Sequence, residues 1–281
     1  METTCYTVNF RPMTEPATET ASEKLLVERD SNGVTVITFN RPQVMNALDL
    51  ETMTQFAQAV SAMQSDAELR TVILTGAGEE AFCSGGDLHE LSALTSEADA
   101  RDFITVMGDA LLKLERLAVP VIAAINGYAL GGGSEVAVAC DMRIMDDQTR
   151  LGFVQIRLGL TPGWGAGQRL MRLVGYSRAM GLLLQGKVIY ADEIDALGLA
   201  TRIVEQGTAL DYALDFAGHI AKQPPEVVRG IKALLRAGLE RPYDEALQIE
   251  RDIFPPLWAG DAHLRAVGKF LEKSREKKGN A

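Results

Sequence analysis

The chain has 281 residues, of which 47% are hydrophobic and only 6% aromatic, and its formal net charge at pH 7 is −10. This length accommodates one large domain together with a smaller helical part. An acidic charge without any basic cluster argues against nucleic acid and against an anionic membrane as partners.

Residues 1–22 are rich in threonine, glutamate and proline, which predicts a disordered tail. They contain one arginine, Arg11, whereas transit peptides are rich in arginine and poor in acidic residues. We therefore expect no targeting signal in this segment.

The body of the chain begins with a predicted hairpin, because residues 25–28 and 34–39 flank the turn dipeptide Asn32-Gly33. Asp49 can cap a helix that starts directly after it. Strands and helices then alternate. Strands are predicted over residues 71–75, 121–125, 142–145, 151–154 and 200–204, and helices over 50–64, 97–117, 134–140, 167–175, 176–184 and 191–197. Four further helices are predicted, over residues 208–222, 225–238, 242–258 and 261–275. This order predicts an α/β body over residues 23–206 and a C-terminal helical region over residues 207–281.

The spacing of the cysteines indicates the cellular compartment in which the protein works. Cys5, Cys83 and Cys140 match no disulfide or metal-binding spacing. No apolar run is long enough to span a bilayer. We therefore expect a cytoplasmic protein without a metal site.

The stretch from Val119 to Asp141 carries the clearest chemical signal. A predicted buried strand leads into Gly131 to Gly133 and then into a helix of small residues. Bare backbone N–H groups at such a helix start favour negative charge. Glu135 lies in the first turn of this helix. The macrodipole alone explains a glutamate there, whereas the absence of a basic neighbour favours a catalytic role.

A second loop, AFCSGGD at residues 81–87, repeats this pattern of strand, glycines and helix start. Two glycine-lined helix starts can direct two N–H donors at one oxygen, as an oxyanion hole does. Asp87, by contrast, has the ordinary position of a helix cap.

Other motifs point to no site. Residues 76–81 superficially fit a dinucleotide fingerprint, but Glu79 and Glu80 would face the pyrophosphate. His89, His219 and His263 lie far apart, and no serine has the surroundings of a nucleophile elbow, so a triad hydrolase is not expected.

Together the two glycine loops resemble those of the crotonase superfamily, the enoyl-CoA hydratase/isomerase family. The resemblance covers residues from about 24 to 273. Its other carriers are Arg41-Pro42 with Asn46-Ala47-Leu48, PVIAAINGYALGGGSEVAVACD at residues 120–141, PGWGAGQRL at residues 162–170, and residues 197–204. The resemblance implies an α/β fold, a crotonase (ClpP-like) spiral of ββα units with a C-terminal helical trimerisation region. It also implies a homotrimer or a hexamer made of two trimers, and an acyl-CoA thioester as substrate.

The resemblance also implies roles for individual residues. The N–H groups of Gly86 and Gly132 would hold the thioester oxygen, and Glu135 matches the first catalytic glutamate of hydratases. The implied substrate-binding residues are Gln43, Val44 and Asn46 near the adenine, Ser84 and Asp87 in the first glycine loop, Trp164, and Phe270 and Lys273 near the C-terminus. No cofactor is implied beyond the coenzyme A moiety of the substrate.

Gln155 departs from the hydratase pattern, in which a second glutamate stands at this position. An amide can orient a water molecule, but it cannot act as a general acid or base at neutral pH. The loss of a general acid or base lowers the rate by a factor of about 10²–10⁴. Residues 153–155 and 162–165 and the segment from Glu250 to Trp258 instead resemble the ethylmalonyl/methylmalonyl-CoA decarboxylase group. Decarboxylation produces an enolate that the oxyanion hole stabilises without a base.

In that reaction Gln155 would hold the departing carboxylate, and Glu135, if burial raises its pKa, would supply the proton. Trp164 would wall the acyl pocket or simply pack in the core. Two alternatives stay open. One is a 2-enoyl-CoA hydratase or Δ-isomerase that uses Glu135 alone. The other is a non-catalytic scaffold that binds CoA or RNA, although the acidic charge disfavours RNA.

Overall fold

A seven-stranded sheet forms the centre of the larger part of the molecule, with the strand order β1-β2-β3-β4-β6-β8-β11. Only β2 and β3 pair antiparallel, around the predicted turn at Asn32-Gly33, and the other neighbours are parallel. The strands are β1 (Arg11–Pro12), β2 (Leu25–Arg29), β3 (Val34–Phe39), β4 (Thr71–Gly76), β6 (Val121–Ile125), β8 (Met142–Asp146) and β11 (Arg202–Val204).

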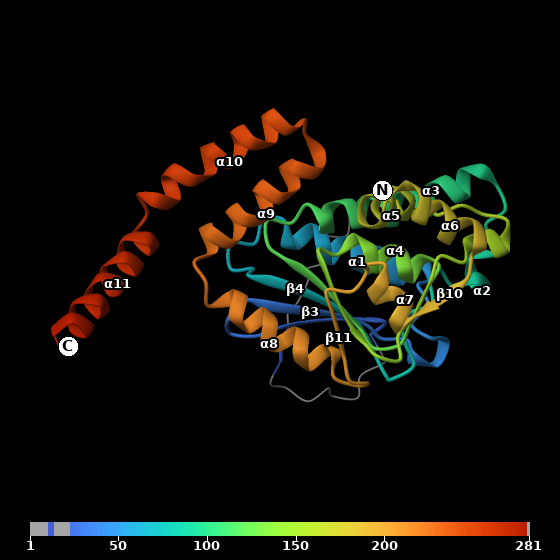
Figure 1. Ribbon diagram of the computed structural model, residues 1–281. Coiled ribbons are helices and arrows are strands. Elements are labelled where there is room, and N and C mark those ends of the chain that lie inside the picture. The colour runs from blue at the N-terminus through green and yellow to red at the C-terminus, as the bar shows by residue number, and fades with distance from the viewer. Residues whose placement is uncertain (1–10, 14–22, 280–281) are drawn as a thin grey trace, which may run out of the picture. The chain divides into compact units, whose positions relative to one another are not determined.

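Helices cover both faces of this sheet (Figure 1). On one face lie α1 (Leu50–Met63), α3 (Glu97–Glu115) and α4 (Gly132–Ala139), and on the other lies α8 (Ala209–Ala221). Because side chains alternate along a strand, Val72 and Leu74 pack in the core beneath α1, α3 and α4. Ile73 packs with the alanines of α8 instead. Burial on both faces explains why the strands are continuous apolar runs in the sequence.

A smaller four-stranded sheet, with the order β10-β9-β7-β5, positions the glycine loops. Its strands are β5 (Ala81–Cys83), β7 (Tyr128–Leu130), β9 (Arg150–Gly152) and β10 (Val188–Tyr190). Since β5 and β7 are parallel neighbours, the loops that follow them emerge at the same edge. The strands β7 and β10 were not predicted, because three residues are too few for a clear alternation.

The remaining helices of this part are short. They are η1 (Pro42–Val44), α2 (Leu88–Leu91), η2 (Gln155–Leu158), α5 (Ala166–Val174), α6 (Tyr176–Gln185) and α7 (Ala191–Ala196). The predicted strand over residues 151–154 ends at Gly152, and the predicted loop after it contains η2. The predicted helix over residues 134–140 starts two residues earlier, so that Gly132 and Gly133 belong to α4.

The computed structural model describes residues 11–13 and 23–279, and its chain forms two compact units, Met1–Ala221 and Lys222–Ala281. The division follows α8, later than the predicted boundary at residues 206–207, because α8 packs on the sheet through its alanines. The predicted disordered tail lies outside the described residues except for residues 11–13. There β1 pairs with β2, which departs from the prediction.

The second unit consists of α9 (Pro225–Glu240), α10 (Tyr243–Trp258) and α11 (Asp261–Gly279), as the sequence predicts. These helices line an apolar groove of about 760 Å³. In its wall the rings of Trp258 and His263 pack at an interplanar angle of 32°, with their centroids 4.4 Å apart. Within the described ranges, no helix combines the length and the apolar character that a membrane span requires.

Candidate active site

The two glycine loops lie against each other, as the sequence analysis predicts. Gly85 has a φ of +103°, and a Cβ atom on it would stand 2.9 Å from the backbone nitrogen of Gly132. A Cβ on Gly133 would stand only 1.9 Å from the carbonyl oxygen of Cys83. Glycine at these positions therefore lets the start of α4 approach the end of β5 closely.

The N–H of Gly86 is directed away from its bridge partner Leu48, and the N–H of Gly132 lies in the first turn of α4. Leu48 forms a parallel bridge with Gly86, in which the Leu48 N–H donates to Gly85 and the Leu48 carbonyl accepts from Asp87. The N–H of Gly86 itself then points to the other side. Gly132 opens α4, and N–H groups in a first turn have no acceptor inside the helix. The oxyanion hole stays a prediction that this geometry permits.

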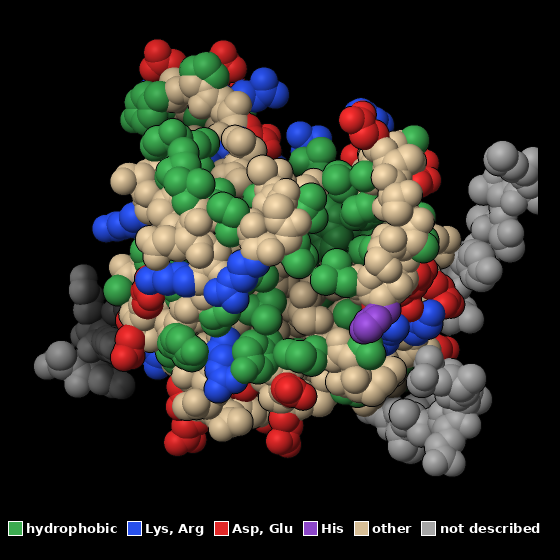
Figure 2. Space-filling model, turned by 90° about the vertical axis from the view of Figure 1, so that its right-hand side faces the viewer, with side chains coloured by type: hydrophobic (Ala, Val, Ile, Leu, Met, Phe, Trp, Pro, Cys, Tyr) green, Lys and Arg blue, Asp and Glu red, His purple; other side chains and the backbone are tan. Residues whose placement is uncertain are grey.

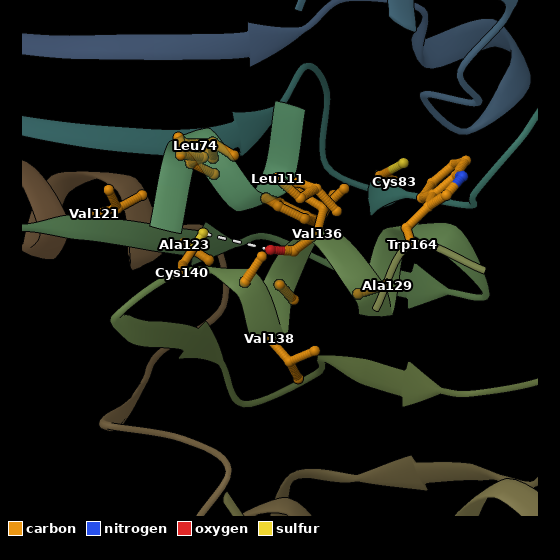
Figure 3. Close-up of a cluster of buried hydrophobic side chains, with 14 of the residues drawn as sticks. Leu74, Cys83, Leu111, Val121, Ala123, Ala129, Val136, Val138, Cys140 and Trp164 are labelled. Carbon is orange, nitrogen blue, oxygen red and sulfur yellow. Dashed lines mark hydrogen bonds between the residues drawn. The ribbon is translucent and has the colours of Figure 1, made fainter. Parts of the chain in front are cut away.

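Trp164 covers the start of α4. A Cβ on Gly132 would lie 2.2 Å from Cζ3 of Trp164, so the indole ring rests directly on the Gly132 backbone. Figure 3 shows the ring beside Cys83, at one end of the buried cluster around α4. Trp164 is only 6% exposed. Trp164 therefore packs in the core and also covers Gly132. A role in core packing and a role as a pocket wall do not exclude each other.

Glu135 is 3% exposed, and its carboxylate accepts four hydrogen bonds. The donors are Gln155 Nε2 at 3.0 Å and Gly163 N at 3.2 Å to Oε1, and Trp164 N at 2.7 Å and Ala166 N at 3.0 Å to Oε2. An ionised carboxylate offers about four lone-pair sites, so all of them are used. Proton exchange at Glu135 in this conformation requires one of these bonds to open.

Burial raises the pKa of the Glu135 carboxyl, because the charged form loses its hydration. The hydrogen bonds from the three backbone N–H groups and from Gln155 oppose this rise without cancelling it. The carboxyl therefore takes up a proton at a higher pH than an ordinary glutamate, as a proton donor at this position requires.

Gln155, the first residue of η2, offers a hydrogen-bond acceptor to the site. Its Nε2 donates to Glu135, and this bond fixes the orientation of the amide. Its Oε1 is buried and has no hydrogen-bond partner in the described part of the chain. An unsatisfied buried acceptor costs about 1–3 kcal/mol, which favours an external donor at this point.

Two of the predicted substrate-binding residues are occupied within the protein. The Asn46 side chain accepts from Arg41 N and donates to the carbonyls of Ala77 and Ala81. Asp87 caps α2 and pairs with Arg41 at 2.9 Å. The structure thus gives both residues a part in holding the loops, and their contact with substrate stays a prediction.

The other predicted substrate-binding residues, apart from the buried Trp164, are exposed or half-buried. Gln43 and Val44 are exposed on η1, and Ser84 N donates to Met45, which brings the first glycine loop beside them. Phe270 and Lys273 are exposed on α11 of the second unit. Their contact with substrate stays a prediction.

Sequence reasoning missed the donors of residues 163–166. The only local signal is the composition Pro162-Gly163-Trp164-Gly165, which predicts a turn but not its partner. Gly165 has a φ of +101°, which explains a glycine there.

The face that carries α2, α6 and β10 is hollowed, and hydrophobic side chains gather around the hollow (Figure 2). Large side chains of these three elements are exposed, among them Leu88, Leu184 and Tyr190. Apolar surface of this kind is typical of a face that meets a ligand or a partner.

Comparisons with known proteins agree with this architecture. The family model described as enoyl-CoA hydratase/isomerase matches residues 29–278. A short-chain-enoyl-CoA hydratase of Clostridium acetobutylicum is 36% identical, over 89% of this chain and 95% of the relative. An ethylmalonyl-CoA decarboxylase of Rattus norvegicus is 32% identical, over 86% of this chain and 82% of the relative. The solved structure of an enoyl-CoA hydratase from Bacillus anthracis matches with a TM-score of 0.85 at 34% identity, over 89% of this chain and 97% of that one.

Proposed function

Because the chain belongs to the enoyl-CoA hydratase/isomerase family, we propose that it decarboxylates a malonyl-type coenzyme A thioester, such as ethylmalonyl- or methylmalonyl-CoA, through an enolate. The crotonase fold that the sequence predicts is confirmed by the match to solved structures. The family makes the protein an acyl-CoA enzyme, and the choice of reaction is the proposal.

The amide beside Glu135 is the observation that carries this choice. The position next to the carboxylate holds the side chain of Gln155, which donates to Glu135 at 3.0 Å, instead of a second carboxylate. Addition of water needs one group to take a proton from the water and another to give a proton to Cα. Cleavage of a carbon–carbon bond with release of CO₂ needs neither group in its first step.

The reaction follows from the residues around the two loops. The bond between Cα and the substrate carboxylate breaks, CO₂ leaves, and the electron pair moves onto Cα and the thioester oxygen. This enolate oxygen accepts hydrogen bonds from the N–H groups of Gly86 and Gly132. One such donor is typically worth about 10²–10³ in rate. Cα then takes up one proton, which comes in the end from solvent.

Glu135 delivers that proton in our proposal, since burial raises its pKa and makes the protonated form easier to reach than in an ordinary glutamate. A protonated carboxyl must give up one accepted hydrogen bond. Gln155 is the only one of the four donors that is a side chain, so it can turn away while the backbone donors stay in place. Its Nε2 is then available to the substrate carboxylate.

Hydration is the second candidate, and the names of the relatives at 36% identity favour it. Oε1 of Gln155, for which the described part of the chain offers no donor, would accept from a water molecule, and Glu135 would both take and return the proton. Isomerisation of the double bond would use Glu135 in the same way. An intact Glu135 speaks against the non-catalytic scaffold.

We also propose that the protein works as a homotrimer or as a pair of trimers. The coenzyme A moiety of the substrate is the only non-protein group that the proposed reaction needs.

A panel of thioesters tests the reaction. We expect CO₂ release from ethylmalonyl- or methylmalonyl-CoA, strongly reduced in Glu135→Ala and unchanged in the exposed control Glu205→Ala. The absorbance of crotonyl-CoA should fall slowly or not at all. Rapid loss of that absorbance with no CO₂ release would establish hydration instead, and CoA binding without any turnover would favour the scaffold.

A further inference from the structure

Arg169 of α5 binds the Trp164 segment through the carbonyl oxygen of Trp164, whereas Glu135 binds it through backbone N–H groups. Its Nη1 donates to the carbonyl of Trp164 at 2.7 Å, and its Nε donates to Oε2 of Glu115 at 2.9 Å. Glu115 is the last residue of α3. The two side chains are only 10% and 18% exposed, so the ion pair is largely shielded from water.

We propose that Glu115 and Arg169 are a positioning pair for the candidate active site, acting through Trp164 on both Glu135 and Gly132. This inference rests on the proposed roles of Glu135 and Gly132 in the reaction. Neither member of the pair contacts the predicted reacting atoms, and the effect passes through the backbone of residues 163–166.

Trp164 is held at both of its backbone polar groups. Its N–H donates to Glu135 at 2.7 Å, and its carbonyl accepts from Arg169 at 2.7 Å. These two bonds fix the backbone dihedral angles of Trp164 and hence the direction of its side chain. The indole ring is thereby kept on the Gly132 backbone.

An arginine suits the two acceptors at this position better than a lysine does. A guanidinium is planar, and its nitrogens can donate hydrogen bonds to a carbonyl and to a carboxylate at the same time. An ammonium group does this less well. Gly165 leaves room for the guanidinium, because a Cβ there would lie 2.7 Å from Nη1 of Arg169. Glu115 balances the charge of the guanidinium and so offsets the cost of burying it.

Loss of the pair has two consequences at the site. The N–H groups of the segment would bind Glu135 less tightly, and since these bonds lower the pKa of Glu135, that pKa would rise further. The indole ring would also leave its place on Gly132. A role in folding stability alone predicts neither change.

Tryptophan fluorescence tests the inference without any turnover. The chain has two tryptophans, so Trp258→Phe leaves Trp164 as the only indole. In that background we expect blue-shifted emission and weak quenching by acrylamide. Arg169→Met should shift the emission to the red and raise the quenching constant about threefold, as in a segment that opens locally. Arg169→Lys should show an intermediate change.

The pH dependence gives the second readout. In Arg169→Met, the limb of the pH–rate profile that belongs to Glu135 should move upward by about one pH unit. The matched control is Arg172→Met, an exposed arginine of the same helix, which should change neither quenching nor the profile. If a folded Arg169→Met protein had the wild-type quenching constant and the wild-type pH–rate profile, the proposal would be overturned.

Glu115→Gln decides the matter if Arg169→Met does not fold, because it keeps the arginine and removes only the charge. We expect a smaller rise in quenching in the same direction, and no rise would overturn the inference. If no thioester is turned over by any form of the enzyme, the proposed reaction fails, and the quenching data still decide whether the pair positions Trp164.

Discussion

The side-chain amide of Gln155 donates a hydrogen bond of 3.0 Å to the carboxylate of Glu135, although 20 positions separate the two residues. The amide satisfies one lone pair of the carboxylate, and its own oxygen is buried without a hydrogen-bond partner among the described residues. The pair thus combines one group that can exchange a proton with one that can only orient a ligand. This asymmetry is the basis on which we separate decarboxylation from hydration.

Gln155→Glu would place a second carboxyl at hydrogen-bond distance from Glu135. Two carboxyls so close share a proton, because the repulsion between the charged forms raises the pKa of the pair. We expect CO₂ release to fall about 10²-fold and hydration of crotonyl-CoA to rise above the wild-type level. Gln155→Ala, the control, should lower CO₂ release without any gain in hydration. Unchanged CO₂ release in Gln155→Glu would show that Gln155 has no part in the reaction.

Gly132→Ala should damage the site at the point where Trp164 rests. The new Cβ would stand 2.2 Å from Cζ3 of the ring, so the ring or the start of α4 must move. Overpacking of this kind costs about 1–3 kcal/mol in the free energy of unfolding. We also expect a fall in kcat of at least about tenfold, because the N–H of residue 132 is displaced.

The matched control for this change is Gly167→Ala in α5, where a new Cβ has no atom within 4 Å. Replacing glycine by alanine reduces the conformational entropy of the unfolded chain. The free energy of unfolding of this variant should therefore rise by about 0.4–1 kcal/mol. Urea unfolding and kcat measured on both variants separate the clash from a general effect of alanine. Equal activity in the two variants would contradict the placement of Gly132 beside the reaction.

Parts of this site can be predicted from the sequence because their signals are local. The glycines of both loops and the position of Glu135 in a first helical turn lie within two short segments. The strands of the large sheet are predictable for the same reason, since Val72, Ile73 and Leu74 form a continuous apolar run that suits burial on both faces.

The partners of Glu135 could not be predicted in this way. Its donors follow it by 20 to 31 positions, and three of them are backbone N–H groups, which leave no trace in residue type. Arg169 and Glu115 lie 54 positions apart on different helices. A pairing of this kind depends on the packing of α3 against the core, and no spacing rule expresses it.

Asp49 should make the stability of the fold depend on pH. It caps α1 through Thr52 and pairs with Lys24 at 2.8 Å. Burial alone would raise the pKa of Asp49, but the hydrogen bonds from Lys24 and Thr52 outweigh burial and hold the pKa below its ordinary value. A lowered pKa in the folded state gives stability that is complete above the ordinary pKa and is lost as the pH falls through the lower one.

Asp49→Asn removes the charge and keeps a good helix cap. We expect it to lower the free energy of unfolding by about 2 kcal/mol at pH 7 and to have little effect at about pH 2–3. Urea unfolding across this range measures the difference. A constant difference in Asp49→Asn across this range would mean that the charge of Asp49 contributes nothing.

The thiol of Cys83 should be inert in the folded protein. It lies at the end of β5, fully buried against the start of α4, and burial raises its pKa to about 12. The thiolate is the reactive form, so its population at pH 8 is very small. In a variant with Cys5→Ser and Cys140→Ala, reaction with a disulfide reagent should be at least about a hundredfold slower in the native protein than in urea. Rapid reaction in the native state would mean that the first glycine loop opens to solvent, and the close packing of the two loops would then not describe the resting enzyme.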